Sequence, residues 1–211
     1  MSAPAADAAL LHAFSRAVVA LLDRDEPADP AVTAELSAVR ARLQRLAAPA
    51  AAGLAAGEAA PAPPRHLTAA LDGWRDGGEE VRAALSALAD RLPWRFSYAP
   101  RADAPDLAER VAWAELVGPS APIRSDRLCV GVTLIAPHTL YPDHRHPAIE
   151  LYRVLSGTAT WSAAGVARPV PPGEWVLHPS GVVHAMRTGA EPLLALYTWS
   201  GEDVVTTSSW A

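Results

Sequence analysis

The feature that most constrains this fold is a series of short, strand-like segments that begins after Pro93 and continues almost to the last residue. Glycine and proline residues separate the segments, which cover residues 94–98, 111–117, 128–135, 151–155, 158–161, 174–177 and 193–199. Many short strands with turn residues between them are typical of a β-sandwich or a small β-barrel. We therefore expect an all-β barrel from about residue 94 onward.

The first 92 residues have a different periodicity. Apolar residues recur at intervals of three and four over residues 5–24 and again over 32–46, which indicates two helices that each bury one stripe. A third helical stretch is expected over 67–92, and Gly77-Gly78 is expected to divide it in two. Residues 1–92 therefore form a helical N-terminal region.

A connector rich in alanine, glycine and proline spans residues 48–64, and three prolines near its end prevent a helix from continuing through it. We expect a flexible joint here, with the helices packed over the outside or the mouth of the barrel. Because 211 residues are too few for two ordinary domains, the division is into the helical region, 1–92, and a catalytic barrel, 93–211.

The charge of the chain argues against several classes of partner. A formal net charge of -5 and a sequence pI near 5.8 give no basic surface for nucleic acid or anionic lipid. Asp7, His12 and Arg16 interrupt the first apolar segment, and no later stretch holds 18 consecutive apolar residues. We expect a cytoplasmic protein with a small-molecule partner, and the sequence leaves a homodimer open.

The histidines are concentrated in one region, since five of the seven lie between residues 138 and 184. Two of them belong to the run His144-Arg145-His146-Pro147-Ala148-Ile149-Glu150. On an extended strand, His144 and His146 point to one face, and Glu150 shares their parity, although Pro147 implies a bend. Cys129 is the only cysteine, so a thiolate cage and an intramolecular disulfide are both excluded.

Imidazole nitrogens and a carboxylate oxygen together suit one divalent transition metal ion, such as Zn, Fe, Mn, Ni or Co. A fourth ligand is expected from another strand. His184 is the candidate, because the turn residues Pro179-Ser180-Gly181 precede it and would set it at the start of a new strand. The predicted metal ligands are therefore His144, His146, Glu150 and His184.

The spacing of these residues resembles both sequence signatures of the cupin superfamily. The first is His-x-His-x-x-x-Glu followed by Gly157, and the second is Gly173, Pro179, Gly181 and His184. This resemblance implies a single cupin barrel, a double-stranded β-helix or jelly-roll, within a mainly β protein. In two departures, His138 replaces a usual glycine and Thr188 a frequent asparagine.

Neither departure falls on a ligand position. We interpret His138 and His178 as residues that surround the site or lie on the surface.

Three longer stretches, 141–152, 178–186 and 191–199, are similar to the cupin-type dimethylsulfoniopropionate lyases of marine bacteria. The resemblance covers about Trp94 to Ser200. These carbon–sulfur lyases split dimethylsulfoniopropionate into dimethyl sulfide and acrylate by β-elimination. The family implies the same four metal ligands, with Tyr152 and Tyr141 working beside them.

The residue types also suit this chemistry on their own terms. A proton next to a carboxylate is difficult to remove, and a metal bound to that carboxylate stabilises the charge that develops. Tyr152 can act as the base, because an unperturbed tyrosine pKa is about 10 and a nearby divalent cation favours the phenolate. A sulfonium cation lacks hydrogen-bond donors and is expected to contact aromatic faces; the candidates are Trp161, Trp175, Tyr197 and Trp199.

Three alternatives stay open at this point. A cupin enzyme of this type could act on another small carboxylate, or an Fe(II) cupin could be a dioxygenase, which would have no need for Tyr141 and Tyr152 as phenol bases. A non-enzymatic, effector-binding cupin is the third, but the N-terminal region lacks a basic helix-turn-helix-like segment.

Overall fold

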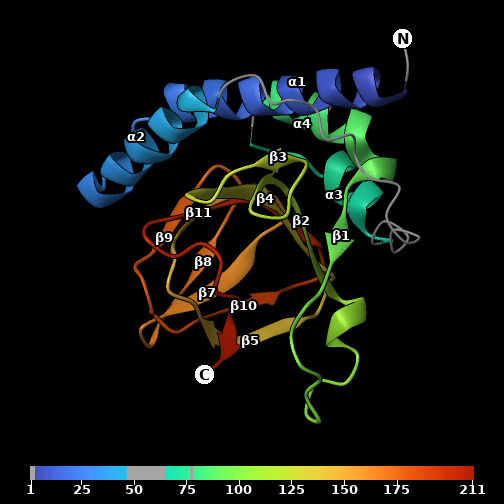
Figure 1. The fold of residues 1–211 in the computed structure, drawn as a ribbon. Coiled ribbons are helices and arrows are strands. Elements are labelled where there is room, and N and C mark those ends of the chain that lie inside the picture. Colours follow the sequence, from blue (N-terminus) through green and yellow to red (C-terminus); the bar gives the residue numbers. More distant parts are fainter. Residues whose placement is uncertain (1–2, 47–64, 77) are drawn as a thin grey trace.

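The computed structural model describes residues 3–46, 65–76 and 78–211, and it consists of a two-sheet β-barrel with helices on one side (Figure 1). The helices are α1 (Ala3–Arg24), α2 (Pro30–Arg45), α3 (Leu67–Asp72) and α4 (Glu79–Leu88), followed by the short 3-10 helices η1 (Ala89–Arg91) and η2 (Leu107–Glu109). Among the described residues, no helix is long and apolar enough to cross a membrane.

Seven strands form the larger sheet, in the order β1-β2-β4-β11-β6-β9, with β3 paired to β2. Their bounds are β1 (Trp94–Arg95), β2 (Val111–Gly118), β3 (Ile123–Arg124), β4 (Leu128–Ile135), β6 (Ile149–Ser156), β9 (Trp175–His178) and β11 (Leu193–Ser200). All of its pairings are antiparallel except the one between β2 and β3.

Five strands form the smaller sheet, in the order β12-β5-β10-β7-β8. Their bounds are β5 (Leu140–Arg145), β7 (Ala159–Ala163), β8 (Val166–Val170), β10 (His184–Thr188) and β12 (Ser209–Trp210). Because successive strands pass from one sheet to the other, the chain forms a jelly-roll, and the predicted cupin fold is confirmed.

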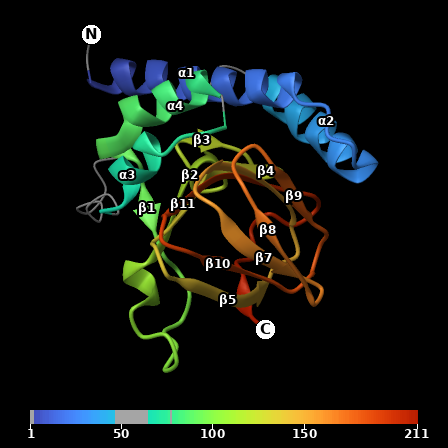
Figure 2. The same ribbon diagram turned by 180° about the vertical axis from the view of Figure 1, so that it is seen from behind.

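The larger sheet is buried on both faces, which all eight residues of β4 illustrate. Val130, Val132 and Leu134 belong to the core that the sheet shares with the helices, whereas Cys129 and Ile135 belong to the core inside the barrel. Alternate side chains of a strand point to opposite faces, so one strand serves both cores. The helices cover the outer face of this sheet and leave the smaller sheet uncovered (Figures 1 and 2).

A buried ionic cluster joins the helical region to β6. The Arg153 guanidinium donates to Asp76 at 2.6 Å and forms an ion pair with Asp25 at the end of α1. The guanidinium carbon lies 5.1 Å from the ring centroid of Trp175, whose indole N–H donates to Asp25 at 2.8 Å. The cluster therefore ties two separate parts of the helical region to the strand that carries Glu150.

Several predicted boundaries change in the structure. The third helical stretch is divided as expected, but α3 already ends at Asp72, because Trp74 leaves the helix and forms a β-bridge with Ser156. The first strand keeps only Trp94 and Arg95, since Phe96 and Tyr98 turn away to pack against Trp113.

The strands β3, β8 and β12 were not predicted, and β5 and β10 were expected only as the strands that carry His144 and His184. The expected flexible connector, 48–64, lies outside the described residues, so it stays a prediction together with the division at residue 92.

Candidate active site

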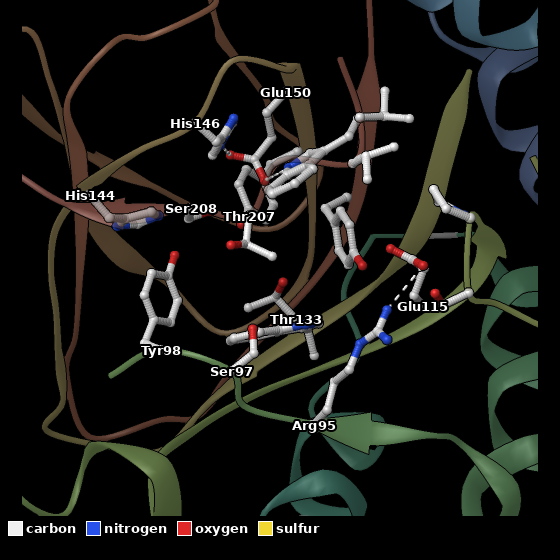
Figure 3. Close-up of a pocket in the computed structure, with 18 of the residues that line it drawn as sticks. Arg95, Ser97, Tyr98, Glu115, Thr133, His144, His146, Glu150, Thr207 and Ser208 are labelled. Atoms are coloured by element: carbon white, nitrogen blue, oxygen red, sulfur yellow. Dashed lines mark hydrogen bonds and ion pairs between the residues drawn. The ribbon is translucent and has the colours of Figure 1, made fainter. Parts of the chain in front are cut away.

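A cavity of about 260 Å³ lies between the two sheets, and residues from both sheets and from the loops at the barrel mouth line it (Figure 3). Since a water molecule occupies about 30 Å³ of liquid, the cavity has room for a small organic molecule. Seven of the predicted site residues line it, namely Tyr141, His144, His146, Glu150, Tyr152, Tyr197 and Trp199.

Strand register explains how residues from distant parts of the sequence meet here. His144 at the end of β5 and His184 at the start of β10 are cross-strand partners in the smaller sheet. Glu150 near the start of β6 lies between Trp199 of β11 and His178 of β9 in the larger sheet. His146 lies in the turn that joins β5 to β6, so both sheets contribute to one cluster.

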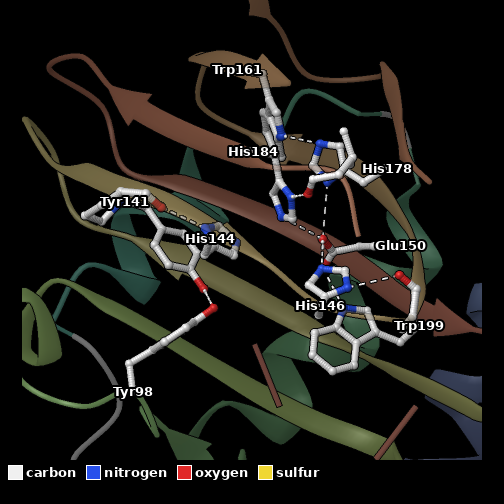
Figure 4. Close-up of polar contacts among 12 residues, drawn as sticks. Tyr98, Tyr141, His144, His146, Glu150, Trp161, His178, His184 and Trp199 are labelled. Atoms are coloured by element: carbon white, nitrogen blue, oxygen red, sulfur yellow. Dashed lines mark hydrogen bonds and ion pairs between the residues drawn. The ribbon is translucent and has the colours of Figure 1, made fainter. Parts of the chain in front are cut away.

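Each of the three predicted histidine ligands is oriented by a backbone carbonyl (Figure 4). The Nδ1 atom lies 2.8 Å from Pro142 O in His144, 3.0 Å from Ala148 O in His146 and 3.0 Å from Val182 O in His184. A carbonyl can only accept, so Nδ1 carries the proton in each ring. The Nε2 lone pairs are thereby left for a ligand, as metal-binding histidines require.

Two of these Nε2 atoms converge on one carboxylate oxygen. Glu150 Oε2 lies 3.0 Å from His146 Nε2 and 3.2 Å from His184 Nε2. Ligand atoms of His146, Glu150 and His184 all lie within 4.8 Å of one another, and all three residues are buried. His144 falls outside this group, but its ring centroid is 4.1 Å from that of His184.

The donor set fits a divalent cation. His184 Nε2 is buried and has no hydrogen-bond partner among the described residues, and the lone pairs of Nε2 and Oε2 face each other. Burial lowers the pKa of His146, but the negative charge and hydrogen bond of Glu150 outweigh burial and raise it. The charge of Glu150 thus favours a cation at His146 Nε2, and a metal ion would supply that positive charge in place of a proton.

His144 and His178 are held neutral. Burial lowers the pKa of His144 well below its usual value, and burial also lowers the pKa of His178 to about 4. His178 Nδ1 lies 3.2 Å from Glu150 Oε2, and its Nε2 accepts from the Trp161 indole at 3.1 Å. His178 thus holds the Glu150 carboxylate in place without being one of the predicted ligands. His138 is exposed.

Three tyrosines surround the cluster, and they differ in their contacts. The Tyr141 hydroxyl donates to the Tyr98 hydroxyl at 2.7 Å, and the Tyr141 ring stacks on His144 with centroids 4.2 Å apart. The Tyr152 hydroxyl interacts with the Thr133 hydroxyl and the Glu150 carboxylate. Burial, followed by neighbouring charges, raises the pKa of Tyr141 and of Tyr152 well above 10, so both are neutral phenols unless a cation lies nearby.

The four aromatic residues expected at the substrate divide into two pairs. Tyr197 and Trp199 line the cavity, and the Trp199 indole donates to Glu150 Oε1 at 2.7 Å. Trp161 does not line the cavity, because it lies beside His178, to which it donates. Trp175 is also misplaced by the prediction, since odd and even residues of β9 face opposite ways and it packs under the helices.

Sequence reasoning missed several lining residues. Tyr98 lies outside the barrel strands, in a loop whose contact with the site has no local signal, and its ring stacks on Trp210 at 4.1 Å. Thr133, Glu115 and Arg95 also line the cavity. The inward parity of Thr133 and Glu115 could have been read from β4 and β2, but only with the pairing register in hand.

Comparison with known proteins gives a consistent result. A family model described as dimethylsulfoniopropionate lyase matches residues 35–195. The DddL protein of Cereibacter sphaeroides, named for that lyase activity, is 37% identical over 142 residues, which are 65% of this chain and 59% of that protein. The dimethylsulfoniopropionate lyase DddQ of Ruegeria pomeroyi is 37% identical over 123 residues, 58% of this chain and 61% of that protein. The matches therefore span about three fifths of the length of these curated relatives.

Solved structures agree with the sequence matches. The crystal structure of DddQ from Ruegeria pomeroyi superposes with a TM-score of 0.66 at 30% identity and covers 85% of this chain and 94% of that chain. A structure from a study of the lyases RdDddP and RnDddQII superposes with a TM-score of 0.63 at 31% identity and covers 74% and 82%.

Proposed function

Because the chain belongs to the dimethylsulfoniopropionate lyase family, we propose that it cleaves dimethylsulfoniopropionate into dimethyl sulfide and acrylate. In this β-elimination a base takes the proton from the carbon next to the carboxylate. The electron pair of that C–H bond forms the C=C bond, and the C–S pair leaves with sulfur, so the sulfonium becomes a neutral sulfide. The observation that carries the proposal is the buried group of His146, Glu150 and His184. His146 and Glu150 line the cavity together with the phenols of Tyr98, Tyr141, Tyr152 and Tyr197.

We assign the binding of one divalent transition metal to His144, His146, Glu150 and His184. When bound, the ion would supply positive charge that favours the carboxylate of the substrate and the phenolate form of a nearby tyrosine. The protein side of the site is already organised for it. Backbone carbonyls fix the three rings, and Trp199 and His178 hold the Glu150 carboxylate by hydrogen bonds.

Tyr152 is the proposed base, and Tyr141 its neighbour with a different task. The proton of Tyr141 is engaged by Tyr98, which favours Tyr141 as a neutral hydroxyl that orients ligands. Tyr152 shares its strand with Glu150, two residues away on the same face. Positive charge at the cluster would therefore act directly on the Tyr152 hydroxyl and favour its phenolate form.

The test is release of dimethyl sulfide. Purified protein loaded with Fe, Mn, Co, Ni or Zn is given dimethylsulfoniopropionate in a sealed vial. Dimethyl sulfide is measured in the headspace and acrylate in solution, and we expect equal amounts of the two products. The assay is repeated without oxygen, where elimination persists and a dioxygenase would stop. Metal-loaded protein that releases neither product would refute the proposal, and chelated protein serves as the control.

A further inference from the structure

The cavity has a second charged end, away from the histidine cluster. Glu115 on β2 lines the cavity, and its side chain is only 12% exposed. Arg95 of β1 also lines it, lies 3.0 Å from Glu115 Oε1 and is 41% exposed (Figure 3). No step of the proposed elimination uses this pair.

Strand register fixes how far this end lies from the base. Glu115 is opposite Gly131 of β4, Gly131 is opposite Tyr197 of β11, and Tyr197 is opposite Tyr152 of β6. Neighbouring strands lie about 4.8 Å apart, so the Cα atoms of Glu115 and Tyr152 are separated by roughly 14 Å. The four positions share one face of the sheet, so the side chains of Glu115 and Tyr152 both enter the barrel, with room between them for a chain of a few atoms.

Because Gly131 has no side chain, an aromatic ring can lie over it, between Glu115 and Tyr152. A Cβ atom at position 131 would lie 2.7 Å from Cε1 and 2.9 Å from Cζ of Tyr197. The phenol ring of Tyr197 therefore lies over Gly131, on the path from the histidine cluster to Glu115. Trp113 lines the cavity as well, whereas Trp199 lies at the histidine end beside His146. The ring of Tyr197 thus separates the histidine end from an ionic end.

This arrangement matches a molecule with a carboxylate at one end and an onium cation at the other. An onium group has no hydrogen-bond donor, and it is attracted by aromatic faces and by a carboxylate at longer range. Arg95 opposes Glu115, but its greater exposure lets water screen its charge more than that of the buried carboxylate. The net field at this end therefore favours a cation.

We propose that Glu115 is a specificity-determining residue that selects substrates with an onium cation beyond the carboxylate. The proposal rests on the proposed function and deepens it. The positive charge on sulfur disappears as the C–S bond breaks, so Glu115 stabilises the bound substrate more than the transition state. Its contribution belongs to KM, and loss of its charge should leave kcat unchanged or higher.

Two isosteric carboxylates test the proposal by binding alone. The probes are 3-(trimethylammonio)propanoate and 4,4-dimethylpentanoate, which differ by a cationic nitrogen in place of a carbon. Titration calorimetry on metal-loaded protein gives the ratio of their Kd values. Wild type should prefer the cation by roughly tenfold, Glu115→Gln should lose most of that preference, and Glu115→Asp should retain most of it.

Arg95→Gln is the matched variant with the opposite expectation. Removal of the opposing cation should keep or increase the preference for the trimethylammonium probe. Loss of binding of both probes in Arg95→Gln would mean that Arg95 holds the carboxylate and would overturn the proposal. So would a wild-type ratio of one or less, which needs no variant to fold.

The two proposals fail separately. A protein that prefers the cationic probe but releases no dimethyl sulfide retains the Glu115 assignment and loses the lyase assignment. An active lyase that binds both probes equally retains the lyase assignment and loses the role of Glu115.

Discussion

The proposed mechanism depends on one hydroxyl group, that of Tyr152, acting as the base. Tyr152→Phe removes the oxygen and keeps nearly all of the ring volume, so folding and metal binding should persist. Positioned proton transfer contributes about 10²- to 10⁴-fold, and kcat for dimethyl sulfide release should therefore fall at least about a hundredfold. Metal content is measured on the same preparation. Near-normal turnover with full metal would transfer the role to Tyr141 or end the mechanism.

The metal ligands are tested by composition. Because His146 and Glu150 converge at 3.0 Å, His146→Ala and Glu150→Ala should each lose most of the roughly one equivalent of metal that the wild type is expected to carry. His138→Ala, which changes an exposed histidine, should retain it. Elemental analysis that finds full metal in both ligand variants would remove the assignment.

At the same scale, the sequence predicted the ligand types well and their companions poorly. His144, His146, Glu150 and His184 could be named because motif spacing carries them, and the structure brings the last three within 4.8 Å of one another. Tyr98 and Trp210 could not be named, because their ring stacking joins residues more than a hundred positions apart. Trp175 and Trp161 were proposed by residue type alone. Trp175 packs under the helices, and Trp161 packs on Tyr152 inside the barrel without lining the cavity.

Among elements, β5, which carries His144, is poorly visible in the sequence. In β5 a proline, an aspartate and a histidine follow Leu140-Tyr141, so ligands stand where apolar residues would mark a strand. The long strands β2, β4 and β11 were predicted nearly to the residue because packing on both faces requires apolar side chains. A strand is predicted from its pattern of apolar residues, and it becomes hard to predict where site residues occupy those positions.

The loop at the barrel mouth and the last strand act as one element. Trp210 of β12 stacks on Tyr98, and its indole donates to Ala99 O at 3.2 Å. Trp210→Ala removes an aromatic pair, which contributes about 0.5 to 1.5 kcal/mol, and hydrogen exchange of amides 96–101 should become about three- to tenfold faster. Amides of β4 are the internal control. Equal exchange in the loop would contradict the coupling.

For the whole molecule, the ionic cluster of Arg153 decides whether the helices stay on the barrel. The Asp76 side chain is 0% exposed and that of Arg153 6%, so Asp76→Ala leaves a buried cation whose remaining anionic partner among the described residues is Asp25. Breaking a buried pair costs about 3 to 5 kcal/mol, and the remaining carboxylate places the expected loss near about 3 kcal/mol. Urea unfolding measures it.

Asp23→Ala is the matched control, because it removes an exposed ion pair with Arg40. Its effect should stay below about 1 kcal/mol. Equal losses in the two variants would mean that the buried cluster is not special.

The division of the chain at residue 92 stays a prediction at this scale. Limited proteolysis is expected to cut first within 48–64 and to leave the barrel, 93–211, intact. A first cut within 128–160 would contradict the division.

The double burial of the larger sheet has a consequence for how this chain can vary. Along β6, Tyr152 faces the cavity and Arg153 faces the helices, and β4 and β11 alternate in the same way. Tolerance to substitution should therefore alternate from one residue to the next along these strands. Residues that face the cavity are constrained by the reaction, and residues that face the helices are constrained by packing against the helical layer. Substitutions at the cavity-facing positions can then change the substrate preference while the helix-facing positions stay unchanged.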